Sequence, residues 1–184
     1  GGQLMKGNEH KALESEDSGQ STDFSSPFTY TPIGIVHSPF SDLAGMPIQP
    51  SGAKGIKGTI EIRQEFIAGL RDVEEFSHLI LIYAFHRCQG YSLEVTPFLD
   101  PRSHGVFATR APKRPNAIGL SIVQLTGIKG TILAIEDVDI LDGTPLLDIK
   151  PYVPAFDSYS NAKAGWLDGV SHHAAFVRSD ERFH

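Results

Sequence analysis

The chain has 184 residues, 40% of them hydrophobic, which is typical of one globular domain with enough apolar side chains for a core. Its formal net charge of −6 at pH 7 argues against a protein that binds nucleic acid through overall positive charge. The single cysteine, Cys88, excludes an intrachain disulfide and a multi-cysteine zinc site. We interpret it as a small buried hydrophobic residue in a reducing compartment.

Residues 1–27 are polar and rich in serine, which predicts a disordered tail, with one domain over residues 28–184. The tail carries a net charge of −3, half of the total, so the domain itself is only mildly acidic. No secretory segment is visible, and the longest apolar run, Leu79–Phe85, is too short to span a bilayer. We therefore expect a cytoplasmic protein.

Short alternating or apolar runs, separated by turn residues, predict a series of β-strands. In chain order the expected strands are Tyr30–Ser38, Ile56–Ile62, His78–Phe85, Ser92–Phe98, Ile118–Thr126, Thr131–Glu136 and Leu146–Lys150. Apolar residues at helical spacing predict one helix over Gln64–Phe76, and Gly127–Gly130 is expected to close a hairpin. This pattern is mainly β and predicts a closed or nearly closed β-barrel of about six to seven short strands with short helical insertions.

Common nucleotide-binding and hydrolase motifs do not occur. No G-x-G-x-x-G follows a predicted strand, and there is no G-x-x-x-x-G-K-[ST] or G-x-S-x-G motif. His86 and Cys88 are expected on one face of a strand, while His172 and His173 are adjacent in sequence. Neither pair has metal-ligand spacing, so we predict no metal site.

The stretch from Arg102 to Asp157 consists of two oppositely charged halves rich in Pro and Gly. The basic half carries Arg102, Arg110, Lys113 and Arg114. The acidic half carries Glu136, Asp137, Asp139, Asp142, Asp148 and Asp157, with Lys150 as its only cation. Stiff loops at strand ends would hold these groups in place, which points to a zwitterionic or polyanionic ligand.

Several residues here have both a functional and a structural interpretation. Arg110 follows GVFAT, which we interpret as a short strand, and precedes Ala111-Pro112; it either grips a carboxylate or phosphate or pairs with an acid after Glu136. Asn116 either contacts a base edge or caps the following turn. Asp142 either binds a ligand or shapes the Asp142-Gly143 turn.

Long segments of the sequence resemble the TsaA-like family of methyltransferases. They are GVFATRAPKRPNAIGLSIVQL at 105–125 and LDGTPLLDIKPYVPAFD at 141–157, with YTPIGIVHSPF, GMPIQP, FSHLILIYAFHR and AKAGWL in the expected order. The family's enzyme uses S-adenosylmethionine to methylate N6 of threonylcarbamoyladenosine beside the anticodon of tRNA. The resemblance implies a β-barrel, a homodimer and a cofactor site near the subunit interface.

The resemblance also implies a set of cofactor-binding residues. They are Pro47, Ile48, Gln49, His86, Arg87, Arg110, Leu120, Asp142, Gly143, Thr144 and Pro145. Lys113, Arg114 and Asn116 are candidates for contact with the substrate, and no general base is identified. Ile48 stands where the family usually has Arg. The family's long form has a further C-terminal domain thought to help hold tRNA, so here we expect the barrel, the dimer or another protein to do so.

The resemblance predicts direct methyl transfer from sulfonium to nitrogen, with much of the rate advantage from positioning. Arg110 would hold the cofactor's carboxylate, and the Asp142 turn would hold its ammonium or ribose. The backbone at Leu120 would face the adenine, and Gln49 would close over it. The alternatives are a regulatory module that only binds S-adenosylmethionine and a methyltransferase on another RNA or small molecule.

Overall fold

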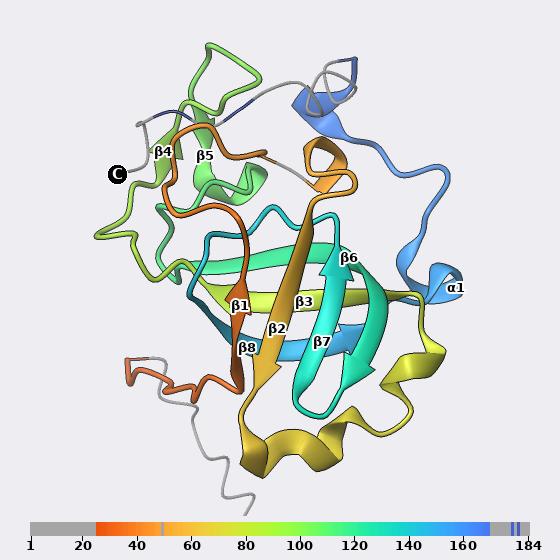
Figure 1. Ribbon diagram of the computed structural model, residues 1–184. Coiled ribbons are helices and arrows are strands. Elements are labelled where there is room, and N and C mark those ends of the chain that lie inside the picture. Colours follow the sequence, from red (N-terminus) through yellow and green to blue (C-terminus); the bar gives the residue numbers. More distant parts are fainter. Residues whose placement is uncertain (1–24, 49, 170–177, 179, 181–184) are drawn as a thin grey trace, which may run out of the picture.

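The structure, a computed structural model, describes residues 25–48, 50–169, 178 and 180. Six antiparallel strands close into a barrel in the order β1-β2-β7-β6-β3-β8 (Figure 1). They are β1 (Gly34–His37), β2 (Lys57–Ile62), β3 (His78–Ala84), β6 (Ile118–Lys129), β7 (Ile132–Glu136) and β8 (Thr144–Pro151). The predicted mainly-β closed barrel is therefore confirmed.

The expected strand over Ser92–Phe98 does not join the barrel. Only β4 (Glu94–Val95) forms there, and it pairs with β5 (His104–Gly105) in a separate two-stranded sheet. Both strands belong to the long connection between β3 and β6, which folds around a small core of its own formed by Val95, Val106 and Ala111. We call residues 86–116 the β4–β5 subdomain.

The barrel core follows from the alternation of the strand sequences. In β3 every second residue, Leu79, Leu81 and Tyr83, is buried, and in β6 Gly119, Ser121 and Val123 occupy the matching inward positions. A Cβ at Gly119 would lie 2.3 Å from the ring of Tyr83, so only glycine leaves room for that tyrosine. The inward positions thus explain why β3 and β6 are largely apolar and why residue 119 is a glycine.

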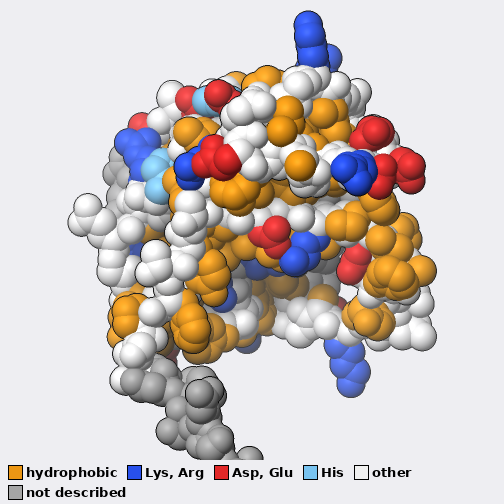
Figure 2. Space-filling model, turned by 90° about the horizontal axis from the view of Figure 1, so that it is seen from below, with side chains coloured by type: hydrophobic (Ala, Val, Ile, Leu, Met, Phe, Trp, Pro, Cys, Tyr) orange, Lys and Arg blue, Asp and Glu red, His pale blue; other side chains and the backbone are white. Residues whose placement is uncertain are grey.

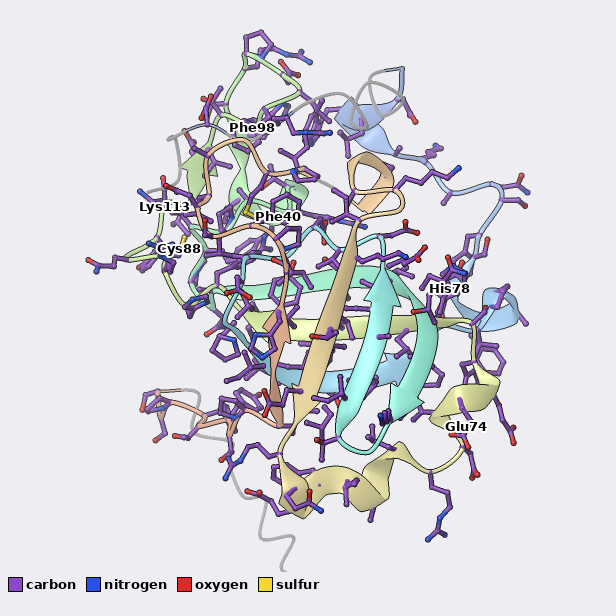
Figure 3. All side chains as sticks on the ribbon, in the orientation of Figure 1. Phe40, Glu74, His78, Cys88, Phe98 and Lys113 are labelled. Atoms are coloured by element: carbon purple, nitrogen blue, oxygen red, sulfur yellow. The ribbon has the colours of Figure 1, made fainter. Side chains whose placement is uncertain are left out.

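The loops between the strands differ at the two ends of the barrel. Residues 38–56, 85–117 and 137–143 all leave or enter the strands at one end, which we call the loop end. At the opposite end, the covered end, β6 and β7 form the expected hairpin, with Lys129 opposite Ile132 and Gly130 at φ 59°. Figure 3 shows Phe40, Cys88, Phe98 and Lys113 toward the loop end, and Glu74 and His78 toward the covered end.

The predicted helix over Gln64–Phe76 is wrong. This segment forms two 3-10 helices, η2 (Gln64–Leu70) and η3 (Val73–Glu75), separated by Asp72 at φ 66°. A left-handed residue cannot lie inside a right-handed helix, and Gly69 is a poor helix former. Leu70 and Val73 still pack on the barrel core, so the apolar spacing correctly identified the buried face.

The covered end contains an apolar cavity of about 550 Å³ between these 3-10 helices and the barrel. Its lining includes Ile33, Ile62, Phe66, Leu70 and Leu79. Figure 2, which views the molecule from this end, shows groups of hydrophobic side chains with charged side chains of both signs among them.

The remaining helical segments are short. They are η1 (Pro50–Gly52), η4 (Val106–Ala108), α1 (Pro154–Asp157) and η5 (Gly165–Leu167). None of the helices in the described part of the chain has the length and apolar character needed to cross a membrane. Residues 1–24, which make up most of the predicted tail, lie outside the described residues, as do His172 and His173.

Candidate functional site

Direct hydrogen bonds join the three long connections at the loop end. The Arg87 guanidinium donates from Nη1 to the carbonyl oxygen of Ser41 at 3.1 Å. The backbone N–H of Ser38 donates to Oδ1 of Asp142 at 3.0 Å, and the N–H of Asp142 donates to the carbonyl of Phe40 at 2.8 Å. The connections that carry Arg87 and Asp142 are therefore both bonded to the connection after β1, at one end of the barrel.

The segment Asp142–Pro145 forms the entry to β8. Gly143 has φ 75° and donates its N–H to the carbonyl of Val36 at 2.9 Å, and Thr144 closes the turn on Leu141 at 3.3 Å. A side chain at position 143 would be strained in that conformation. The Asp142-Gly143 turn expected from the sequence is present, and the Asp142 carboxylate is exposed, with Oδ1 3.5 Å from Nδ1 of His37.

Arg110 follows a 3-10 turn and not the strand expected from GVFAT. The turn, η4, forms because the N–H of Thr109 bonds to the carbonyl of Val106 at 3.1 Å, and the Thr109 hydroxyl bonds to the same oxygen at 2.9 Å. This local bonding competes with an extended conformation. Arg110 itself is exposed, and its charge lowers the pKa of both Asp139 and Tyr83. It therefore lies beside the mouth of the barrel.

A polar chain that the sequence did not reveal runs from the barrel core toward Arg110. The Tyr83 hydroxyl lies 3.0 Å from Oγ of Ser121, and that Oγ donates to Oδ1 of Asp139 at 2.6 Å. Since Ser121 uses its one proton on Asp139, Tyr83 is the donor to Ser121. The chain fixes a carboxylate at the loop end of an otherwise apolar barrel.

Burial has the largest effect on the pKa values of Asp139 and Tyr83 in these hydrogen-bonded side chains. It raises the pKa of Asp139 to about 6, against smaller lowering effects from the Ser121 bond, the residue's own backbone and Arg110. Burial also raises the pKa of Tyr83, and the negative charge of Asp139 adds to the rise. Tyr83 thus stays neutral, while Asp139 exchanges its proton close to neutral pH. The signal available in the sequence was a polar Tyr and Ser at inward positions of apolar strands.

His86 and Arg87 occupy a turn after β3, and both are exposed. The N–H of His86 bonds to the carbonyl of Ala84 at 2.8 Å, and that of Cys88 bonds to Phe85 at 3.0 Å. His86 and Cys88 consequently do not share a strand face. Burial and then the charge of Arg87 lower the pKa of His86, so its imidazole is neutral at neutral pH.

Cys88 is half-buried rather than fully buried. Burial raises the pKa of its thiol, which opposes formation of the thiolate. Among the described residues, no group of three His, Cys, Asp or Glu side chains is placed to hold a metal ion.

The long loop after β1 carries the next three candidates. Pro47 is buried and pairs through an antiparallel bridge with Arg178, and Ile48 is half-buried. Gln49 lies outside the described residues. The part of this loop that is described thus lies against a residue close to the C-terminus.

The candidate substrate residues lie at the exit of the β4–β5 subdomain. Arg114 folds back and donates from Nη1 to the carbonyls of Thr109 and Ala111, at 3.1 and 3.2 Å. The backbone carbonyl of Asn116 accepts from Ile118 at 2.8 Å, so its main chain closes the turn while its side chain is exposed. Arg114 therefore stabilises the loop that presents its neighbour Arg110.

Leu120 lies apart from the other candidates, on the outer wall of the barrel. It is 48% exposed and pairs with Ile82 of β3, beside the pairs Ala84–Ile118 and Ile80–Ile122. All six side chains point outward and all are apolar. We call this set the β3–β6 outer face. It adjoins the loop end because Ile118 and Ala84 lie where their strands begin and end.

The chain matches a family of known proteins over most of its length. Residues 35–158 match the family described as tRNA-methyltransferase O N-terminal domain. A "Probable S-adenosyl-L-methionine-binding protein" from Pyrococcus abyssi is 58% identical over 154 residues, which is 84% of each chain. A "tRNA (adenine(37)-N6)-methyltransferase" from Mus musculus is 39% identical over 137 residues, which is 71% of this chain and 32% of the mouse protein.

The fold agrees with solved structures. The crystal structure of TrmO from Pseudomonas aeruginosa is similar with a TM-score of 0.65 and 38% identity, and the match covers 77% of this chain and 63% of that one. The chain thus spans most of the Pyrococcus protein but less than two thirds of these other relatives. The match extends from β1 through all the candidate residues of the loop end to α1. This chain belongs to the tRNA-methyltransferase O N-terminal domain family.

Proposed function

We propose that the protein is an S-adenosylmethionine-dependent methyltransferase that methylates N6 of the adenosine beside the anticodon of tRNA, when this adenosine carries a threonylcarbamoyl group. The observation that carries the proposal is the convergence of the three connections, with Arg87, Arg110 and Asp142, at the loop end. Related proteins carry the names "tRNA (adenine(37)-N6)-methyltransferase" and "Probable S-adenosyl-L-methionine-binding protein". We expect the protein to act in the cytoplasm.

The residues at the loop end fit the chemistry of S-adenosylmethionine. The cofactor has a carboxylate, an ammonium, a ribose and an adenine, and when bound it supplies an electrophilic methyl group. The exposed guanidinium of Arg110 suits the carboxylate, and the exposed carboxylate of Asp142 suits the ammonium or a ribose hydroxyl. The half-buried Ile48 adds apolar surface, while the exposed His86 and Arg87 border the same end.

Asp139 is our candidate for the proton acceptor. The acceptor nitrogen is attached to a carbonyl and is a poor nucleophile, so removal of its proton favours attack on the methyl group. The Ser121 bond fixes the Asp139 carboxylate at the barrel mouth, and its pKa of about 6 leaves it mostly ionised at neutral pH. Lys113, Arg114 and Asn116 lie beyond Arg110 in the chain and would contact the RNA.

A homodimer is part of this proposal. The β3–β6 outer face is apolar, with Ile118 and Leu120 40% and 48% exposed, and it is flanked by the Lys150–Asp148 ion pair at 2.8 Å. Such a face is typical of a surface that a second copy covers. A second copy there would place Leu120 at the interface and the loop end close to it. Light scattering of L120E tests this, because a charge in the face should give a monomer.

The direct test is methyl transfer from labelled S-adenosylmethionine to tRNA, followed by mass spectrometry of the nucleosides. Two tRNA preparations are compared, with and without the threonylcarbamoyl group. A methyl gain only on the modified adenosine supports reaction and substrate together. A gain on unmodified tRNA would correct the substrate, and no gain despite cofactor binding by calorimetry would favour a protein that only binds the cofactor.

A further inference from the structure

The β4–β5 subdomain exposes three large apolar side chains. Phe107 is 76% exposed, Tyr91 63% and Leu93 59%, although the subdomain has its own core of Val95, Val106 and Ala111. In η4 the direction of the side chains alternates sharply, since Val106 is 1% exposed and its neighbour Phe107 is the most exposed of the three. The core is therefore complete without Phe107, and an apolar ring of this size faces outward without helping to fold the subdomain.

Backbone bonds bring the segments that carry these side chains together with Lys113. The N–H of Ser92 bonds to the carbonyl of Lys113 at 3.3 Å, which joins the Tyr91–Leu93 segment to the backbone at that lysine. The N–H of Val106 bonds to the carbonyl of Leu93 at 2.9 Å, which joins the same segment to the residue before Phe107. We call Tyr91, Leu93, Phe107 and Lys113 the aromatic surface.

The charge of the subdomain is opposite to that of the whole chain. Residues 86–116 hold five Arg or Lys and two Asp or Glu, a formal charge of +3 within a chain of −6. Of the two acids, Asp100 already binds Arg102 at 2.8 Å and His104 at 3.1 Å. The surroundings of the aromatic surface therefore favour a polyanionic partner over a basic or purely apolar one.

The surface is also held rigidly. The ring of Trp166 stacks on His104 at 4.5 Å, and its indole N–H donates to the carbonyl of Ala108 at 2.8 Å. These contacts fix both ends of η4, on which Phe107 lies. A preset aromatic ring loses little conformational entropy when a flat partner stacks on it.

We propose that the aromatic surface docks unpaired nucleotides of the RNA substrate, with bases stacked on Phe107 and Tyr91 and Lys113 against the phosphates. Sequence-tolerant recognition of single-stranded RNA combines exposed aromatic rings with nearby cations in this way. The proposal rests on the proposed function and specifies where the anticodon loop lies. Arg110 follows Phe107 by three residues, so the docked loop would lie next to the candidate cofactor site.

The test is F107A, measured by the KM for tRNA in methyl transfer and by fluorescence anisotropy with a labelled RNA of the anticodon stem and loop. We expect the KM and the RNA dissociation constant to rise roughly 10-fold, because stacking on one aromatic side chain accounts for a large part of such binding. The dissociation constant for S-adenosylmethionine should not change. F107W should restore RNA binding, since an indole stacks at least as well.

The matched control is F156A, which removes an equally exposed phenylalanine, 71% against 76%, from α1 outside the subdomain. Unchanged RNA binding in F107A, or an equal loss in F156A, would overturn the proposal. So would a shift of F107A from dimer to monomer, because the aromatic surface would then be a subunit contact. If the wild type methylates no tRNA, the proposed function fails, and the anisotropy of wild type against F107A still decides whether this surface binds RNA.

Discussion

The two ends of the barrel are built from the same six strands but from opposite kinds of residue. The loop end carries three long connections joined by hydrogen bonds from Ser38, Arg87 and Asp142, and it holds the hydrogen-bonded chain from Tyr83 through Ser121 to Asp139. The covered end has two 3-10 helices over an apolar cavity of about 550 Å³. The barrel is thus a common support whose one end is specialised for polar chemistry, and changes at the two ends should have separable effects.

The largest expected effect comes from D139N. Burial raises the pKa of this carboxyl from 3.8 to about 6, so the folded protein binds the proton more tightly than the unfolded chain does. The contribution of Asp139 to the free energy of unfolding therefore falls as pH rises from about 4 to about 6. Above this window, ionisation of Asp139 lowers the free energy of unfolding by roughly 3 kcal/mol. D139N removes the charge, so its stability relative to wild type should rise across this window in urea denaturation at successive pH values.

The same residue predicts a pH dependence of activity. Wild-type methyl transfer should fall below pH about 6 as Asp139 becomes protonated, and D139N should be roughly 100-fold slower without this acid limb. D148N, at an exposed carboxylate paired with Lys150, is the matched control and should leave the rate unchanged. A D139N protein with the wild-type rate would remove Asp139 from the mechanism.

R110A comes next in size. Loss of a guanidinium that binds a carboxylate should weaken S-adenosylmethionine binding roughly 30-fold, or about 2 kcal/mol, with the fold intact. Calorimetric titration measures it. The control at the covered end is R63A, which loses the ion pair with Glu65 and should bind the cofactor normally. Normal cofactor binding by R110A would show that Arg110 does not hold the cofactor at the loop end.

The barrel itself could be predicted from the sequence because the alternation of inward and outward residues is a local property of each strand. Each strand, such as His78–Ala84, shows its inward and outward residues within a few positions, and six such strands leave few ways to bury their apolar faces. The 3-10 helices were not accessible, because the left-handed conformation of Asp72 depends on how the segment returns to the barrel. The turn at Val106–Ala108 was missed because Thr109 bonds locally to Val106.

The candidate site was only partly accessible. Arg110, Asp142 and Arg87 were identified from residue type and from family resemblance, but the placement of their loops depends on hydrogen bonds that span 46 and 104 residues of sequence. Asp139 appeared only as one of several acids. Its distinction comes from Ser121 and Tyr83, which face inward from β6 and β3. A sequence pattern within one segment does not contain such an arrangement of two strands and a loop.

L70A is the corresponding change at the covered end. Leu70 is partly buried against the core and lines the apolar cavity, so its truncation should lower the free energy of unfolding by about 1.5 kcal/mol. Cofactor affinity should stay within twofold of wild type. Urea denaturation and calorimetry on the same sample measure both. A large loss of cofactor affinity in L70A would mean that the two ends are coupled.

The smallest expected effect is that of R87A. The exposed Arg87 guanidinium donates to the carbonyl of Ser41 and so ties the loop after β1 to the end of β3. Its loss should lower the free energy of unfolding by only about 0.5–1 kcal/mol and weaken cofactor binding about 3-fold. An R87K control keeps the charge, and recovery of affinity in R87K would assign the effect to charge and not to the bond geometry.

Hydrogen exchange with and without saturating S-adenosylmethionine tests the division between the two ends most directly. We expect slower exchange in residues 38–48, 85–117 and 137–145, with no change in residues 64–76 at the covered end. Protection confined to residues 64–76 and the strands around the apolar cavity would contradict it, because the cofactor would then bind at the covered end.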